Sequence, residues 1–296
     1  MTAPRPRRSI LYMPGSNARA LEKARTLPCD GVILDLEDAV APDQKVAARA
    51  QVVEAVKAGG FGHREVVVRA NAWSTAWGRD DVEAVAGSGA DAILLPKVES
   101  AEDVFEVGRA LNRLDAPDTL AIWVMMETPG AVLAAGEIAG AVGDGEGRRL
   151  EAFVIGTNDL AKDTRARLVK GRANMIPWLA TFVAAARAYD LSIIDGVYTD
   201  LTDEEGLKEE CLQGVELGMD GKTLIHPNQI KAANAAFAPD PSEIEWSRKV
   251  LAAFELPENE GRGAIRLEGK LVERLHADIA RRTIALADAI FLRDAG

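Results

Sequence analysis

Two acidic residues that each follow a run of apolar residues are the first candidates for chemistry in this sequence. Glu127 comes directly after the apolar segment 120–126, and Asp159 lies just beyond the apolar segment 152–156. Continuous apolar runs of this length are typical of strands that are buried on both faces in a parallel sheet. A carboxylate at the end of such a strand must be solvated, paired or bound to a metal, because a lone buried charge is too costly.

The types of nearby residues favour a magnesium or manganese site. Carboxylate oxygens are hard ligands, which suit Mg²⁺ or Mn²⁺. The three histidines, His63, His226 and His276, are scattered without the spacing of zinc ligands. Glu37 and Asp38 follow another apolar run, at 31–34, and are candidates to orient metal-bound water. The alternative for these two acids is a strand-end turn or a helix amino terminus.

Basic residues also follow apolar runs. Arg69 follows the segment 66–68, and Lys97 comes soon after the segment 92–95. An arginine near a two-carboxylate metal site suggests stabilisation of negative charge on an oxygen, as in an enolate or a carboxylate. A structural salt bridge between Arg69 and the same acids is the alternative. Together these strand-end residues favour a functional cluster over ordinary loop polarity.

The apolar runs themselves predict the fold. Eight of them start near residues 10, 31, 65, 92, 120, 152, 192 and 222, and helix-compatible segments such as 43–58, 100–114, 174–189 and 204–217 lie between them. This alternation is typical of βα units with parallel strands. We therefore predict an α/β fold, a (β/α)8 TIM barrel. An open doubly wound sheet is disfavoured because no glycine-rich dinucleotide motif follows the first strand.

A change in composition after residue 238 divides the chain into a catalytic barrel domain, 1–238, and a C-terminal helical extension, 239–296. Ser242 is a plausible N-cap for a helix over 243–255, and 256–263 reads as a loop. Apolar residues from Leu271 to Ile290 then line one face of a final helix. We expect this extension to act as a lid or to mediate oligomerisation.

Composition narrows the class of protein. The chain has 296 residues, of which 48% are hydrophobic, and its net charge of −11 argues against nucleic-acid binding. Residues 1–25 nevertheless carry a net charge of +5, which fits either a solvated basic tail or a site for a phosphorylated ligand. No apolar run is long enough to span a membrane. The first eight residues lack the apolar core of a secretory signal, so we predict a cytoplasmic protein.

Seven segments carry a resemblance to a known family: RSILYMPGSN, ILDLEDAV, VVVRAN, LLPKVES, METPGAV, IGTNDLAKD and GKTLIHPNQI. Between residues 8 and 230 the chain resembles the citrate lyase β-subunit-like branch of the HpcH/HpaI aldolase family. The resemblance implies a (β/α)8 barrel with a Mg²⁺ ion that acts on acyl-CoA substrates such as malyl-CoA, citramalyl-CoA or a citryl thioester. It also implies a homo-oligomer, either a trimer or a hexamer.

The resemblance also assigns roles to individual residues. Glu127 and Asp159 match the two metal ligands, with Glu127 also at the substrate. Arg69 matches the arginine that holds the thioester or enolate oxygen, and Glu37 and Asp38 match acids around the metal waters. Arg8, Ser9 and Lys97 resemble positions near the CoA phosphates.

The C-terminal segment departs from the family pattern. Relatives that act on CoA thioesters carry an Asp-x-Pro lid motif, whose aspartate serves as an acid or base, often in the neighbouring subunit's site. Here Glu273 stands at the aspartate position and Leu275 at the proline position. A glutamate moves the carboxylate by about one carbon–carbon bond, a displacement that matters for a catalytic group. Glu273 is therefore either a catalytic acid or a solvated residue.

Our main prediction is a Mg²⁺-dependent lyase that cleaves or forms the carbon–carbon bond of a 3-hydroxyacyl-CoA through a thioester enolate. The alternative is an (S)-malyl-CoA thioesterase with the same metal site, which the change at Glu273 keeps open. A citrate lyase β subunit that acts on a carrier-protein thioester is a third hypothesis. A non-catalytic barrel is disfavoured, because Glu127, Asp159 and Arg69 are all present.

Overall fold

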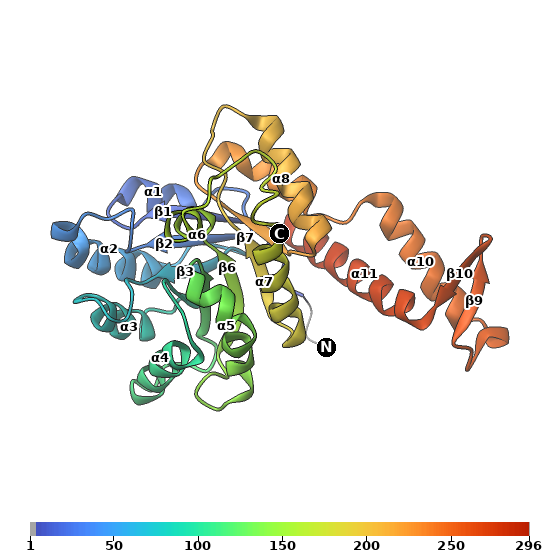
Figure 1. The fold of residues 1–296 in the computed structure, drawn as a ribbon, viewed down its shortest axis with the longest axis horizontal. Helices are drawn as coiled ribbons and strands as arrows, with labels where there is room; N and C mark the ends of the chain where they lie inside the picture. Colours follow the sequence, from blue (N-terminus) through green and yellow to red (C-terminus); the bar gives the residue numbers. More distant parts are fainter. Residues whose placement is uncertain (1–3, 296) are drawn as a thin grey trace. The chain divides into compact units, whose positions relative to one another are not determined.

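The computed structural model describes residues 4–295 and contains a closed barrel of eight parallel strands (Figure 1). The strands are β1 Ser9–Pro14, β2 Gly31–Asp35, β3 Glu65–Arg69, β4 Ala92–Leu95, β5 Ala121–Met126, β6 Leu150–Ile155, β7 Ser192–Asp195 and β8 Gly221–Leu224. Each begins within two residues of the start expected from its apolar run. The predicted (β/α)8 barrel is therefore confirmed.

Helices follow the strands and surround the barrel (Figure 1). They are α1 Ala18–Ala24, α2 Lys45–Ala58, α3 Gly78–Ala86, α4 Ala101–Arg113, α5 Pro129–Gly140, α6 Thr157–Thr164, α7 Ile176–Ala188, α8 Glu204–Leu217 and α9 Ile230–Ala236. The turn after β5 is fixed by local chemistry. The Thr128 side chain accepts a hydrogen bond from the Ala131 N–H, and Pro129 opens the helix. Glu127 is thereby held between a buried strand and a capped helix.

Alternate residues of the strands fill the interior of the barrel. Ile33, Val67, Trp123, Val154 and Ile194 are all fully buried members of this core. Because side chains alternate between the two faces of a strand, the residues two positions further along point into the barrel as well. This period of two carries polar side chains into the interior at the carboxyl ends of β2, β3 and β5.

Polar side chains close the amino-terminal end of the barrel. The Arg7 guanidinium donates two hydrogen bonds to Glu65, at 2.8 and 2.7 Å, and lies 4.9 Å from the ring centre of Trp123. Arg7 also pairs with Glu151. These contacts satisfy the polar groups at this end and stabilise the barrel. Such a stabilising role is usual for the face of a TIM barrel opposite the active site.

The chain forms two compact units, and the barrel unit spans Arg7–Asn234. The other unit contains α10 Pro241–Glu255, the hairpin of β9 Ala264–Leu267 and β10 Lys270–Glu273, and α11 Arg274–Ala295. Val250, Ile265 and Val272 belong to its own apolar core. None of the helices in the described part of the chain is long and apolar enough to cross a membrane.

Three details of this second unit differ from the sequence-based expectation. The cap of α10 is Asp240 and not Ser242, because the Asp240 carboxylate accepts the Ser242 N–H at 2.8 Å and Glu243 completes a capping box. Leu271 lies in β10 and not in the final helix. The predicted loop 256–263 contains a short 3₁₀ helix, Pro257–Asn259.

Candidate active site

Arg69 is held at the carboxyl end of the barrel by the last residue of the neighbouring strand. Asp35 and Arg69 end β2 and β3 and are direct partners in register. Nε and Nη2 of Arg69 donate to the two Asp35 oxygens at 2.7 and 2.6 Å. A bidentate pair of this kind fixes the plane of the guanidinium as well as its position.

Three further groups surround the Arg69 guanidinium. Nη1 lies 2.6 Å from Glu37 Oε2 and 3.4 Å from Asp38 Oδ2, and the Tyr12 ring centre lies 4.9 Å from the guanidinium carbon. Burial alone would lower the pKa of Arg69, but Tyr12, Asp35 and Glu37 raise it, so the side chain stays charged. Asp38 contributes less to orientation, because its side chain is 68% exposed.

Glu37 is the acid whose protonation is most sensitive near neutral pH. Burial raises the pKa of its carboxyl to about 7, although Arg69 acts in the opposite direction. A carboxyl with a pKa near the working pH is suited to proton transfer.

Glu127 and Asp159 meet at the ammonium group of Lys97. Glu127 is fully buried, and its Oε1 accepts the Lys97 backbone N–H at 2.9 Å. Lys97 Nζ lies 3.4 Å from the same oxygen and 2.8 Å from Asp159 Oδ2. Burial raises the pKa of the Glu127 carboxyl, and Lys97 opposes that shift.

The donor set around Glu127 fits a divalent cation. Glu127 Oε2 is buried and has no hydrogen-bond partner within residues 4–295. Gly156 leaves room beside it, since a Cβ at this position would lie 2.6 Å from Oε2. Five carboxylates, those of Asp35, Glu37, Asp38, Glu127 and Asp159, form ion pairs with two cationic side chains, Arg69 and Lys97. This excess of negative charge favours a cation.

The type of cation follows from the number of protein ligands. The described residues contain no group of three or more His, Cys, Asp or Glu side chains placed to hold a metal. The chain therefore offers Glu127 and Asp159, and water or substrate oxygens would complete the shell. Such a site is typical of Mg²⁺, which keeps several waters, and not of zinc with three or four protein ligands.

Two of the residues that the sequence singled out, Arg8 and Ser9, lie away from this cluster, and a third, Glu273, belongs to the second unit. Arg8 and Ser9 stand at the amino end of β1, where Arg8 pairs with Asp30 at 2.9 Å and the Ser9 hydroxyl donates to Asn234 at 2.6 Å. The structure therefore does not bring them together with Glu127. Glu273 is exposed in the second unit, where its N–H donates to His276 Nδ1 at 2.9 Å. Its catalytic role stays a prediction.

Sequence reasoning missed Asp35, Tyr12 and Gly156. The missing signal was the strand period, because Tyr12 and Asp35 lie two residues beyond the core residues Ile10 and Ile33. Had the alternation been continued to the end of each strand, it would have pointed both side chains into the barrel interior, as it does for Arg69.

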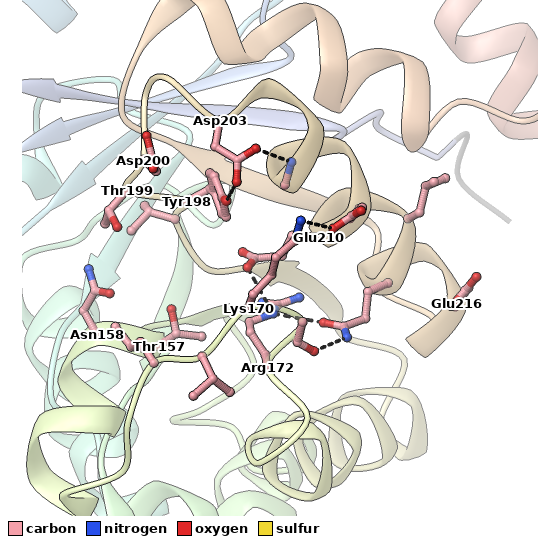
Figure 2. A pocket seen from close by; sticks show the side chains of 18 residues that line it. Thr157, Asn158, Lys170, Arg172, Tyr198, Thr199, Asp200, Asp203, Glu210 and Glu216 are labelled. Atoms are coloured by element: carbon pink, nitrogen blue, oxygen red, sulfur yellow. Dashed lines mark hydrogen bonds and ion pairs between the residues drawn. The ribbon is translucent and has the colours of Figure 1, made fainter.

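A cavity of about 540 Å³ lies beside the first turn of α6 (Figure 2). One wall contains Thr157 and Asn158, in the same turn of α6 as Asp159, and the remaining walls come from segment 168–172, segment 197–200 and α8. The Arg172 guanidinium in this wall is neutralised by Asp195 at 2.7 Å. Among the described residues, its lining does not include Glu127, Asp159, Lys97 or Arg69, so the cavity is separate from the charged cluster.

Comparison with known proteins identifies the family. The model of the HpcH/HpaI aldolase/citrate lyase family matches residues 8–227. The chain belongs to this family. The prediction made from the seven motifs is thereby confirmed.

Several known proteins align with this chain over nearly their whole length. The chain is 49% identical to a (3S)-malyl-CoA thioesterase of Cereibacter sphaeroides (strain KD131 / KCTC 12085), with 96% of each chain covered. It is 32% identical to the citrate lyase subunit beta of Escherichia coli (strain K12), with 98% of this chain and 96% of the relative covered. A crystal structure of the protein CitE from Mycobacterium tuberculosis, in complex with magnesium, acetoacetate and coenzyme A, superposes with a TM-score of 0.74. That structure is 31% identical and covers 95% of this chain and 97% of its own.

Proposed function

We propose that this chain is a Mg²⁺-dependent enzyme of malyl-CoA-type thioesters and that its main reaction is hydrolysis of (3S)-malyl-CoA. The observation that carries the choice of hydrolysis is the 49% identity, over 96% of both chains, to a (3S)-malyl-CoA thioesterase. The site geometry supports the broader class, because it combines two carboxylate ligands with an oriented arginine. This choice reverses the order of the two predictions made from sequence, in which cleavage came first.

Glu127 and Asp159 would hold the metal ion. When bound, Mg²⁺ supplies a Lewis acid that polarises a substrate oxygen. Gly156 keeps the space beside Glu127 Oε2 open, and the capped start of α5 fixes the carboxylate. A complex of the related CitE protein with magnesium supports this assignment.

Arg69 and Glu37 would act on the thioester. The Arg69 guanidinium, fixed by Asp35, donates to the thioester oxygen as negative charge develops on it. Glu37, 2.6 Å from Arg69, accepts a proton from a water molecule that attacks the thioester carbon. The carbon–sulfur bond then breaks, and the thiolate takes up a proton, so the products are malate and free CoA.

Carbon–carbon cleavage is the second candidate. The similarity to a citrate lyase subunit beta favours it, and the same arginine would stabilise a thioester enolate. In that reaction the substrate hydroxyl loses its proton and the C2–C3 bond breaks. A carboxylate, for which Glu273 is the candidate, then protonates the enolate carbon. The products are acetyl-CoA and glyoxylate.

A product assay separates the two reactions. Purified protein is incubated with Mg²⁺ and (3S)-malyl-CoA, and free thiol and glyoxylate are measured separately. We expect thiol to form without glyoxylate. Glyoxylate without thiol would overturn hydrolysis in favour of cleavage, and the absence of both products would contradict the proposed substrate class.

A further inference from the structure

The Lys97 ammonium lies against both Glu127 and Asp159, the two residues proposed to hold the metal ion. The ammonium nitrogen is 3.4 Å from Glu127 Oε1 and 2.8 Å from Asp159 Oδ2, so one cation reaches both carboxylates. We propose that Lys97 is a built-in counter-cation that competes with Mg²⁺ for this pair. The ammonium that Mg²⁺ displaces then binds the anionic group of the substrate. This inference rests on the proposed metal-dependent function.

The backbone at Lys97 holds the side chain in this position. Lys97 has a φ of 56°, which is uncommon for a residue with a side chain and costs backbone energy. In this conformation its N–H donates to Glu127 Oε1 at 2.9 Å. The residue therefore contacts the same carboxylate twice, through the backbone and through the ammonium, and the strained geometry directs Nζ back to the predicted metal ligands.

The ammonium is an incomplete partner for the two acids. It approaches only Oε1 of Glu127, and Oε2 stays buried without a hydrogen-bond partner in the described chain. A single positive charge also balances only one of the two carboxylates. A divalent ion balances the charge of both carboxylates and accepts several oxygen ligands at once. Its binding would therefore displace the ammonium.

The Lys97 side chain reaches the surface, although its ammonium nitrogen is buried. The side chain is 33% exposed and that of Glu127 is 1% exposed, so a rotation of Lys97 alone would take the ammonium away from the carboxylates. After the ammonium leaves the carboxylates, it remains near them, because the Lys97 backbone stays hydrogen-bonded to Glu127. A metal ion and a freed ammonium then present two separate positive groups, which suits a substrate with a terminal carboxylate.

The test is a titration with Mn²⁺, in which electron paramagnetic resonance measures the free ion. Lys97→Met removes the ammonium, and Lys97→Gly removes it while also relieving the strained φ. Both variants should bind Mn²⁺ about tenfold more tightly than the wild type or better, because a positive charge a few ångströms from the ion is gone. Lys170→Met is the matched control, since Lys170 pairs with Glu209 at 3.0 Å in an exposed position; its affinity should equal that of the wild type.

Malate serves as the second probe. It should tighten Mn²⁺ binding to the wild type more than to Lys97→Met, because only the wild type has an ammonium to release. Equal or weaker Mn²⁺ binding by both Lys97 variants would overturn the competition and leave the proposed function intact. Failure of every protein to bind Mn²⁺ would overturn this inference together with the metal-dependent function.

Discussion

At the scale of single residues, Gly156 is under the tightest steric constraint in the site. Its φ of −110° suits any residue, but an added Cβ would lie 2.4 Å from the Glu127 Cβ and 2.6 Å from Oε2. Gly156→Ala should therefore shift Glu127, weaken Mn²⁺ binding by at least about tenfold and lower the free energy of unfolding by about 1–3 kcal/mol. Metal titration and urea denaturation measure the two effects.

A second glycine provides the control. Gly136 lies inside α5, and a Cβ there would meet no atom within 4 Å. Gly136→Ala should leave metal affinity unchanged and stabilise the helix by about 0.5–1 kcal/mol. Wild-type metal affinity in Gly156→Ala would show that Glu127 does not need the space that the glycine provides.

Glu37 predicts a pH dependence of stability. Burial raises the pKa of its carboxyl in the folded chain to about 7, above the ordinary value of 4.5, so folding favours the protonated form. Its contribution to stability is complete below pH 4.5 and is lost as the pH rises through 7. From pH 5 to pH 8, the wild type should therefore lose up to about 3 kcal/mol relative to Glu37→Gln.

Urea denaturation in the presence of a chelator measures this difference. The exposed Glu54 on α2 offers a matched substitution, Glu54→Gln. An equal difference between wild type and Glu37→Gln at both pH values would contradict the assignment.

The same residues show which features of the site could be predicted from the sequence. The position of Glu127, Asp159 and Arg69 at or just beyond the carboxyl ends of barrel strands was predictable, because each charged residue follows an apolar run and a lone buried charge is costly. Their roles stay predictions. The position of Lys97 between the acids was not predictable. It depends on a φ of 56° at Lys97, and no local sequence pattern predicts that conformation.

At the scale of elements, a buried charge cluster joins β7, β8, α8 and the segment before α7. Asp195 is fully buried and pairs with Arg172 at 2.7 Å and with Lys222 at 2.8 Å, and Lys222 also pairs with Glu210 at 2.6 Å. Burial would raise the pKa of Asp195, but Lys222 and Arg172 lower it, so the carboxylate stays ionised.

Asp195→Ala should be strongly destabilising, because it leaves the two buried cations Arg172 and Lys222 to share a single carboxylate, that of Glu210. We expect the free energy of unfolding to fall by about 3–5 kcal/mol. Glu205→Gln on α8 removes an exposed pair with Lys208 and should cost less than about 1 kcal/mol. Urea denaturation compares both with the wild type, and equal stability of the two variants would mean that the cluster does not hold these elements together.

Strands and hairpins differ in how well the sequence predicts them. The barrel strands were predictable, because most of them contain a continuous apolar run buried on both faces. The exception is β8, whose sequence is GKTL. The hairpin of β9 and β10 was missed. Its turn places Glu268 and Gly269 at φ values of 50° and 81°, and turns of this kind are usually recognised by asparagine or aspartate before the glycine. Here Glu268 precedes the glycine, so the sequence lacks the usual signature of this turn.

At the scale of the whole molecule, the chain consists of a barrel that carries the candidate active site and a second unit with its own core. The second unit exposes Leu271, Leu275 and Ile279, at 67%, 54% and 53%. These apolar side chains are candidates for a contact surface in the predicted homo-oligomer. The trimer or hexamer itself stays a prediction, since contacts between copies of a chain are not encoded in its strand periodicity.

The central claim is that Glu127 and Asp159 hold the ion on which turnover depends. The most direct test is the rate of (3S)-malyl-CoA turnover, followed through free thiol and glyoxylate, for wild type and Glu127→Gln with and without Mg²⁺. The account predicts that a chelator abolishes wild-type turnover and that Mg²⁺ restores it. Folded Glu127→Gln should remain at least about 10²-fold slower at any Mg²⁺ concentration. Full wild-type turnover in chelator, or wild-type rates in Glu127→Gln, would contradict it.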